Sequence, residues 1–154
     1  MRQDDGEHAF YVYAVARPRQ GREPGNLPTE GIVPPAPVYT VAHRDLLAVV
    51  SPVSLAEFSP EALETNLQDT GWAQARVLAH QRVLAGLLNG YVLIPLKFCT
   101  LYASQERLFL LLTQHHQALD DAMRRLEEAT EWGVKLFCNR RRLVEWVQEH
   151  SEAL

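Results

Sequence analysis

The chain has 154 residues, 47% of them hydrophobic and 22% charged, and a net charge of -4. These values are typical of one folded domain with a sizeable core and argue against disorder. The acidic balance argues against the concentrated basic surface of most nucleic-acid-binding domains. The polar N-terminus has no signal-peptide pattern, and no apolar stretch approaches the roughly 20 residues that span a bilayer, so we expect a cytoplasmic protein.

The first third of the chain predicts three strands and one long loop. Residues 9–16 are aromatic and β-branched, which predicts a strand buried on both faces. Residues 17–36 are rich in proline and glycine and show no periodicity, which predicts a mobile loop or one that a partner orders. Residues 37–53 predict a β-hairpin that turns at residues 43–45.

Two helices are expected to follow the hairpin. Ser59-Pro60-Glu61 combines a capping serine with a proline suited to the first helical position, and this short helix ends near Leu67. A longer helix runs from about Trp72 to Asn89, where Gly90 is a plausible stop. Helical spacing gives this second helix an apolar stripe, made of Ala73, Val77, His80, Leu84 and Leu87 or Leu88.

The remaining chain predicts two strands and two helices. Residues 91–101 read as one strand, in which Pro95 implies a bulge or an edge position. Ser104 begins a helix that continues to about Thr130, with an apolar face that includes His115. Residues 132–138 predict the final strand, and Asn139 caps a last helix that runs to about Ala153.

This order of elements predicts an α+β fold. We expect residues 1–138 to form a ferredoxin-like sandwich, in which a mixed or antiparallel sheet packs against helices. Residues 139–154 are expected to form a C-terminal helix, which could be the start of a second part of a longer protein.

The histidines and cysteines do not form a recognisable metal or catalytic pattern. His115 and His116 are adjacent on a helix and point about 100° apart, so they cannot share one metal ion as an i, i+4 pair can. We interpret His115 as a core or boundary histidine, and Cys99 and Cys138 as buried structural thiols. His80 on its apolar face is either a hydrogen-bonded structural histidine or a general base.

Other signals of chemistry are missing from the sequence. It contains no phosphate-binding glycine-rich loop, no nucleophile elbow and no paired acid and base, so we predict no catalytic, cofactor-binding or metal-binding residues. The local charge cluster Arg140, Arg141 and Arg142 is either a solvated turn or a surface for an acidic partner. Together with Pro34 and Pro35 of the long loop, these arginines are our candidates for partner binding.

Several blocks in order carry a resemblance to a known family. The first blocks are Phe10-Tyr11-Val12-Tyr13-Ala14-Val15 and Gly31-Ile32-Val33, followed by Asp45-Leu46-Leu47-Ala48-Val49-Val50-Ser51-Pro52-Val53. The most telling blocks are Pro95-Leu96-Lys97-Phe98-Cys99-Thr100 and Glu131-Trp132-Gly133-Val134-Lys135, which come after Ala79-His80-Gln81-Arg82. In this series the chain resembles the N-terminal part of the GvpF/GvpL gas vesicle proteins. The resemblance marks His80, Pro95, Lys97, Phe98, Glu131, Trp132 and Gly133 as motif residues.

The chain departs from the family pattern at two blocks. The family usually has His-Glu at His80-Gln81 and Arg-Phe-Gly at Lys97-Phe98-Cys99. Lysine in place of arginine loses a planar bidentate donor, and cysteine in place of glycine adds a side chain where backbone could approach closely. Family members are usually longer, so the chain is either a short member or a truncated one.

The resemblance implies an accessory or minor structural protein of gas vesicle assembly, without enzymatic activity or a cofactor. Its implied partners are the small hydrophobic shell protein and other gas vesicle accessory proteins. Two alternatives stay open because a fold does not fix a function. One is a ferredoxin-like enzyme or small-ligand binder, which a deep polar pocket holding His80, Lys97 or Cys99 would favour. The other is a regulatory interaction domain unrelated to gas vesicles, with Arg140–Arg142 as its contact surface.

Overall fold

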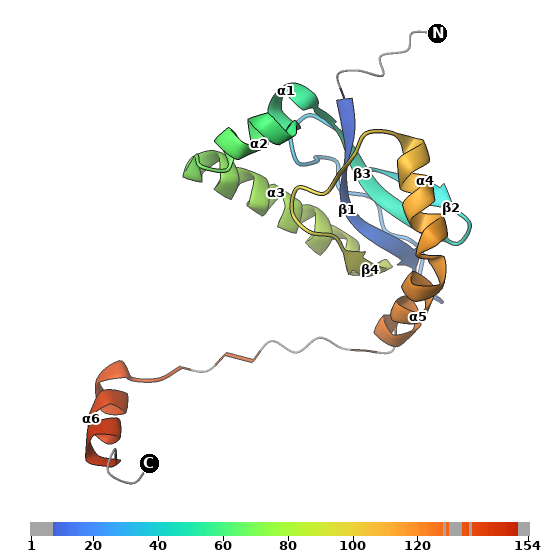
Figure 1. Ribbon diagram of the computed structural model, residues 1–154. Coiled ribbons are helices and arrows are strands. Elements are labelled where there is room, and N and C mark those ends of the chain that lie inside the picture. The colour runs from blue at the N-terminus through green and yellow to red at the C-terminus, as the bar shows by residue number, and fades with distance from the viewer. Residues whose placement is uncertain (1–7, 128, 130–133, 136, 151–154) are drawn as a thin grey trace.

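A computed structural model describes residues 8–127, 129, 134–135 and 137–150. An antiparallel sheet forms its centre, and helices cover both faces of that sheet (Figure 1). The elements are β1 (His8–Pro18), β2 (Tyr39–His43), β3 (Leu46–Ser54), α1 (Leu55–Phe58), α2 (Pro60–Asn66), α3 (Thr70–Leu87), β4 (Tyr91–Pro95), β5 (Leu101–Tyr102), α4 (Gln105–Gln114), α5 (His116–Glu127) and α6 (Arg140–His150).

The strand order is β2-β3-β1-β4, and β5 pairs with β1 beyond the end of β4. Every pair of strands is antiparallel. This is the strand order of a ferredoxin-like sheet, with residues 19–38 in place of the helix that usually joins the first two strands. The predicted α+β class is therefore confirmed, including the C-terminal helix. Helices lie on both faces of the sheet, so the fold has one layer more than the two-layer sandwich that we expected.

The central strand β1 changes face at a β-bulge. Val12 is opposite Val50 of β3, but Ala14 is opposite Val49, so Tyr13 is an extra residue in the ladder. As a result, Tyr13 and Ala14 both pack in the core under α3, whereas Val12 and Val15 pack in the core under α4 and α5. The predicted burial of this strand on both faces is confirmed.

The long loop between β1 and β2 packs against its own chain. The Arg19 N–H donates to the Gly90 carbonyl over 2.9 Å, and the Arg22 side chain donates to the Asn89 carbonyl over 3.2 Å. A Cβ on Gly90 would lie 2.6 Å from the Gly25 nitrogen, so the close approach of this loop explains that glycine. Ile32 is fully buried. Side chains of β1, α3 and β4 bond to this loop, which we had expected to be mobile or ordered by a partner.

Two predicted elements are split in the structure. The expected strand 91–101 ends at Pro95 and resumes at Leu101, with residues 96–100 forming a connection, which we call the β4–β5 loop. Pro95 lies on the edge strand β4, next to this interruption. We expected an edge or a bulge there because proline lacks the backbone N–H that a central strand donates. The expected helix from 104 to 130 breaks into α4 and α5 at His115, which leaves the helical region with φ of -105° and ψ of 8°.

Ion pairs at the end of β1 fasten α5 to the sheet. Arg17 pairs with Asp120 of α5 over 2.7 Å and with Asp45 in the β2–β3 turn. The His116 Nε2 atom lies 2.7 Å from Asp45, and hydrogen bonding to His116 lowers the pKa of the Asp45 carboxyl. These contacts place the start of α5 beside the β2–β3 turn.

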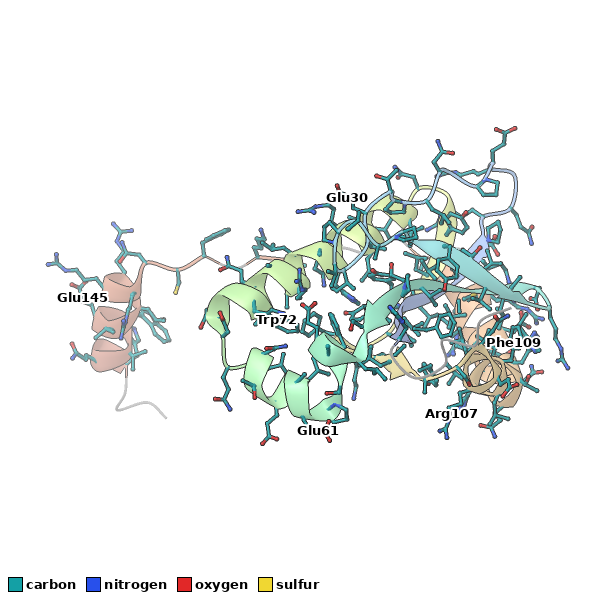
Figure 2. The ribbon with its side chains drawn as sticks, turned by 90° about the horizontal axis from the view of Figure 1, so that it is seen from above. Glu30, Glu61, Trp72, Arg107, Phe109 and Glu145 are labelled. Atoms are coloured by element: carbon teal, nitrogen blue, oxygen red, sulfur yellow. The ribbon has the colours of Figure 1, made fainter. Side chains whose placement is uncertain are left out.

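The C-terminal helix lies apart from the rest of the chain. Asn139 caps α6 as predicted, because its side chain accepts from the N–H groups of Arg141 and Arg142. Figures 1 and 2 show α6, with Glu145 labelled in the second view, well separated from the sheet and its helices. Of the predicted strand 132–138, residues 134, 135, 137 and 138 are described, and none of them is in a strand. Among the described residues, no helix is long and apolar enough to cross a membrane.

Candidate functional site: an apolar groove between helix α3 and strand β4

An apolar groove of about 510 Å³ opens between α3 and β4, and we call it the α3–β4 groove. Helix α3 contributes Val77, His80 and Leu84 to one wall, and its C-cap residue Leu88 extends that wall. Strand β4 and the β4–β5 loop contribute the other wall through Leu93, Pro95, Leu96 and Phe98, and Leu126 of α5 lies at the rim. Most of its accessible lining is carbon, as expected of a site that binds an apolar surface.

The apolar arc of α3 is wider than the sheet can cover, and this creates the helical wall of the groove. Ala79, His80, Val83 and Leu87 are buried against the sheet. The adjoining side of the same arc remains open, with Val77 41% exposed and Leu88 53% exposed. The predicted apolar stripe of α3 was thus partly wrong. Leu87 is buried as expected, but Ala79 and Val83 are buried in addition, whereas Val77 is exposed and Leu84 is only partly buried.

The β4–β5 loop bends away from β1 and brings Phe98 to the groove. The Leu96 N–H donates to the Tyr13 carbonyl over 2.9 Å, and the Thr100 N–H donates to the Lys97 carbonyl over 3.1 Å. Cys99 completes the turn with a φ of 60°, in the left-handed region that favours glycine. Glycine would adopt this backbone conformation without the strain that a Cβ adds.

A buried hydrogen-bond chain fixes the floor of the groove. The Cys99 N–H donates to the Tyr11 hydroxyl over 3.2 Å, and that hydroxyl lies 2.9 Å from Nδ1 of His80. Burial lowers the pKa of His80 and raises the pKa of Tyr11, so both groups are neutral at pH 7. Among the described residues, Nδ1 of His80 is the acceptor within reach of the Tyr11 proton, and donation to Nδ1 leaves the imidazole proton on Nε2.

The other nitrogen of His80 is available in the groove. Nε2 has no hydrogen-bond partner among the residues that the structure describes, and His80 is one of the groove-lining residues. The ring of Phe98 meets the imidazole edge-to-face, with centroids 6.0 Å apart. The groove therefore presents apolar walls and one imidazole N–H donor at its floor.

A second buried network supports the same side of the sheet. The Tyr13 hydroxyl accepts from the Ile32 N–H over 2.6 Å and donates to Ser51 over 2.9 Å, and Ser51 in turn donates to the Pro37 carbonyl. A Cβ on Gly31 would lie 2.3 Å from the Ser51 oxygen, so only glycine fits there. This network positions residues 31–37 of the long loop on the sheet.

The chemistry of the groove favours binding over catalysis. Burial raises the pKa of the Cys99 thiol to about 11, so it is protonated at neutral pH and is a poor nucleophile. The Nδ1 atom of His80 is already occupied by its hydrogen bond with the Tyr11 hydroxyl. In the described part of the chain, no three histidine, cysteine or acidic side chains gather as a metal site would require.

The structure brings together some predicted site residues and separates others. His80, Pro95 and Phe98 line one groove, and Lys97 is exposed between two of its lining residues. Pro34 and Pro35 instead line a separate depression beside His8 and Pro52. Arg140, Arg141 and Arg142 begin α6, apart from both places (Figure 1). Glu131, Trp132 and Gly133 lie outside the described residues.

Two interpretations of the sequence are corrected by burial. Cys138 is exposed and Cys99 is half-buried in a loop, so they are not a pair of buried thiols at strand ends. His115 is exposed at the end of α4, because the helix breaks there and the expected apolar face does not continue through it.

Other groove residues were missed in the sequence. Leu93 and Leu126 come from elements far apart in the chain, so no local pattern joined them to α3. One feature of the sequence could have indicated the groove. The apolar positions from Ala79 round to Val77 and Leu88 cover more of the helix circumference than one sheet face can bury.

Comparisons with known proteins identify the family of the chain. The family model of the gas vesicle synthesis protein GvpL/GvpF matches residues 9–154. The chain is 32% identical over 127 residues to gas vesicle protein L of Streptomyces sp. (strain CB03234), covering 82% of this chain and 47% of that protein. It is 27% identical over 125 residues to gas vesicle protein F of the same strain, covering 81% and 47%.

The chain spans about half the length of these curated relatives. No solved structure matches it. Because the family model covers almost the whole chain, including both walls of the groove, the chain belongs to the GvpL/GvpF family of gas vesicle synthesis proteins.

Proposed function

We propose that this protein is a non-enzymatic assembly protein of gas vesicles and that the α3–β4 groove binds the small hydrophobic shell protein. Its place of action is then the cytoplasm, at the growing gas vesicle. A shell built through apolar surfaces needs its subunits shielded before they assemble, since exposed apolar patches aggregate. A groove that covers part of such a surface and later releases it suits this role.

The observation that carries the proposal is the open apolar lining of the groove. Val77, Leu88 and Leu126 are each more than 40% exposed, yet they converge on one hollow. Scattered exposed leucines are ordinary on a protein surface, but a contiguous apolar hollow is typical of an interaction site. Two of the blocks that carry the family resemblance, at His80 and at Pro95–Phe98, meet at this hollow.

The groove also suggests how a partner is oriented. Apolar walls supply affinity without direction, whereas the N–H of His80 supplies one directed hydrogen bond. A backbone carbonyl at a helix end or in a loop of the shell protein is a suitable acceptor, because such groups lack an intrahelical partner. Lys97 at the rim adds a positive charge for an acidic side chain beside the apolar segment.

The enzymatic alternative receives less support from this geometry. It required a deep polar pocket around His80, Lys97 or Cys99, whereas the hollow is open and mainly apolar. The thiol is protonated, and the histidine is held in one tautomer by Tyr11.

Co-expression and pull-down with the shell protein test the proposal. In the variants Val77→Asp and Leu88→Asp, a carboxylate replaces an apolar side chain that is already exposed, so folding should be retained. Burying one apolar side chain contributes about 1.5–3 kcal/mol, so each variant should weaken capture by about tenfold or more. The matched control is Leu110→Asp on α4, since Leu110 is 55% exposed but lies outside the groove.

Equal capture by Leu88→Asp and Leu110→Asp would show that the shell protein binds elsewhere. The depression beside Pro34 and Pro35 would then be the next surface to vary. Deleting part of the long loop is a poor test, because Ile32 and Gly31 are built into the core and their loss would unfold the domain.

A further inference from the structure

Strand β4 ends the sheet on one side, and its outer edge is unpaired within the described part of the chain. Its inner edge pairs with β1 over its whole length. The Arg19 N–H donates to the Gly90 carbonyl just before β4, and the Leu96 N–H donates to the Tyr13 carbonyl just after it, each over 2.9 Å. These two bonds fix which backbone groups of β4 face β1 and which face outward.

Leu93 and Pro95 carry outward-facing backbone groups on this edge. In an antiparallel pair, positions bonded to the neighbouring strand alternate with positions whose N–H and C=O point away from it. The two flanking bonds and the register place Val92 and Ile94 at the bonded positions. Leu93 therefore directs an N–H and a C=O away from β1, and Pro95 directs a C=O, since proline has no N–H. Among the described residues, none bonds to these three groups.

The α3–β4 groove runs along this open edge. Its lining includes Leu93 and Pro95 together with Leu84 of α3 and Leu126 of α5. Helix α3 packs on one face of the sheet and α5 on the other, and Figure 1 shows β4 between them. A hollow lined by helices from opposite faces lies beside the edge strand and not on one face alone. The unpaired groups of Leu93 and Pro95 therefore belong to the groove.

These backbone groups restrict what can occupy the groove. An occupant that covers the Leu93 N–H or C=O without bonding to it loses roughly tenfold or more in affinity for each group. A helix bonds its own backbone groups internally and has none to offer along its length. An extended segment presents an N–H and a C=O on the same side at every second residue, which is the pattern that Leu93 requires.

We propose that the groove binds its partner as an extended segment that adds a strand to the outer edge of β4. This inference deepens the proposed function, because it names the kind of segment that is bound. Only the identity of the partner as the shell protein rests on that function. A second copy of this chain is a poor occupant, because its own β4 edge is recessed between α3 and α5 in the same way.

The walls of the groove specify an added strand that is apolar on both sides. Side chains alternate between the two faces of a strand. Leu93 packs on the α3 side of the sheet and Ile94 on the α5 side. A partner residue opposite Leu93 therefore points toward Leu84 and Leu88, and its neighbours in the segment point toward Leu126.

The two ends of the edge make the added strand short. At one end Tyr91 is buried, and its hydroxyl donates to the Gly25 carbonyl of the long loop over 3.5 Å. At the other end Pro95 lacks an N–H, and Leu96 begins the β4–β5 loop. The accessible edge accommodates a segment of roughly four residues, or about 13 Å at the rise of a strand.

Hydrogen exchange at Leu93, followed by NMR of the full chain, tests the proposal directly. Its amide should exchange at least about tenfold more slowly when the shell protein is added. Leu101 of β5 is the matched control, because its amide also faces away from β1 but lies outside the groove. Protection should appear at Leu93 and not at Leu101. Bound shell protein without protection of Leu93 would overturn the strand addition.

A pair of variants isolates the outward N–H from the side chain. Leu93→Pro and Leu93→Ala both remove the leucine, but only proline removes the N–H. Because that N–H faces away from β1, the proline breaks no bond of the β1–β4 ladder. Leu93→Pro should bind about three- to tenfold more weakly than Leu93→Ala. Equal binding would overturn the proposal, and if Leu93→Pro does not fold, the exchange of Leu93 in the unmodified chain decides.

A synthetic peptide separates this inference from the proposed function. The probe has four alternating valine and isoleucine residues between pairs of lysines, and its control carries N-methyl groups on the four apolar residues. The probe should protect Leu93 and bind at least about tenfold more tightly than the control. If the probe does so but the shell protein is not captured, the strand addition stands and the proposed partner fails. If the shell protein is captured by a chain in which Leu93 stays unprotected, the binding role stands and the strand addition fails. If neither the probe nor the shell protein protects Leu93, the strand addition also fails.

Discussion

The two faces of the sheet are packed with different side chains. Under α4 and α5 the fully buried residues are aliphatic or methionine, with Leu108, Leu112 and Met123 on the helices. Under α3 and the long loop, the core includes the aromatic residues Tyr11, Tyr13 and Phe58. The hydroxyls of the two tyrosines make buried hydrogen bonds. Figure 2 shows Trp72 of α3 and Phe109 of α4 on either side of the sheet.

This difference has a functional meaning. The aliphatic face is stabilised mainly by burial of apolar side chains, with the Arg17–Asp120 ion pair at its end. The face under α3 is held by directed bonds at Tyr11 and Tyr13, so its backbone is fixed even where apolar side chains stay open to solvent. A groove with a defined shape can be kept on such a face, and the α3–β4 groove lies there.

The largest effect is expected on the aliphatic face. Leu112→Ala removes a fully buried side chain of α4 and should lower the free energy of unfolding by about 2–5 kcal/mol. Urea denaturation followed by circular dichroism measures this change. Leu110→Ala, on the same helix but exposed, should change the value by about 0.5 kcal/mol or less. Equal losses in the two variants would contradict the packing described for α4.

The polar network is expected to have the next largest effect. Tyr13→Phe leaves the Ile32 N–H and the Ser51 hydroxyl without their buried partner, and should lower the free energy of unfolding by about 1–3 kcal/mol. Tyr102→Phe is the matched control, because its hydroxyl has no hydrogen bond to any described residue. A Tyr13→Phe variant as stable as the control would show that this face does not depend on directed bonds.

The free energy of unfolding should depend on pH through His80. Burial holds the pKa of His80 below its ordinary value of 6.5, so the unfolded chain binds the proton more readily. The resulting stability is complete above about pH 6.5 and is lost as pH falls through the folded-state pKa. His80→Gln should flatten the pH profile of the free energy of unfolding in this range. A profile that stays equally steep in His80→Gln would contradict this assignment.

The smallest effect is expected at the turn beside the groove. Cys99→Gly and Cys99→Ala both remove the thiol, but only glycine relieves the left-handed backbone. Cys99→Gly should therefore be more stable than Cys99→Ala by about 1 kcal/mol, as measured by thermal unfolding. Equal stability of the two variants would mean that residue 99 leaves this conformation in solution.

Local patterns in the sequence were sufficient for most elements. Alternation and β-branching predicted β1 and the hairpin, and caps at Ser59, Ser104 and Asn139 predicted where helices begin. The breaks at Pro95–Leu101 and at His115 were missed, because each depends on where the chain must turn to follow the sheet. Helix α1 was also missed, since its four residues are too few for a periodic signal.

The sequence by itself determined the α+β class and the family, because these depend on short-range patterns and ordered blocks. Only the tertiary structure decided which apolar residues of α3 remain open. Val83 turns to the sheet and is buried, whereas Val77 and Leu88 turn away from it and stay exposed. The physical reason is that one sheet face covers only part of the apolar arc of α3, and the covered part depends on how the helix is rotated against the strands.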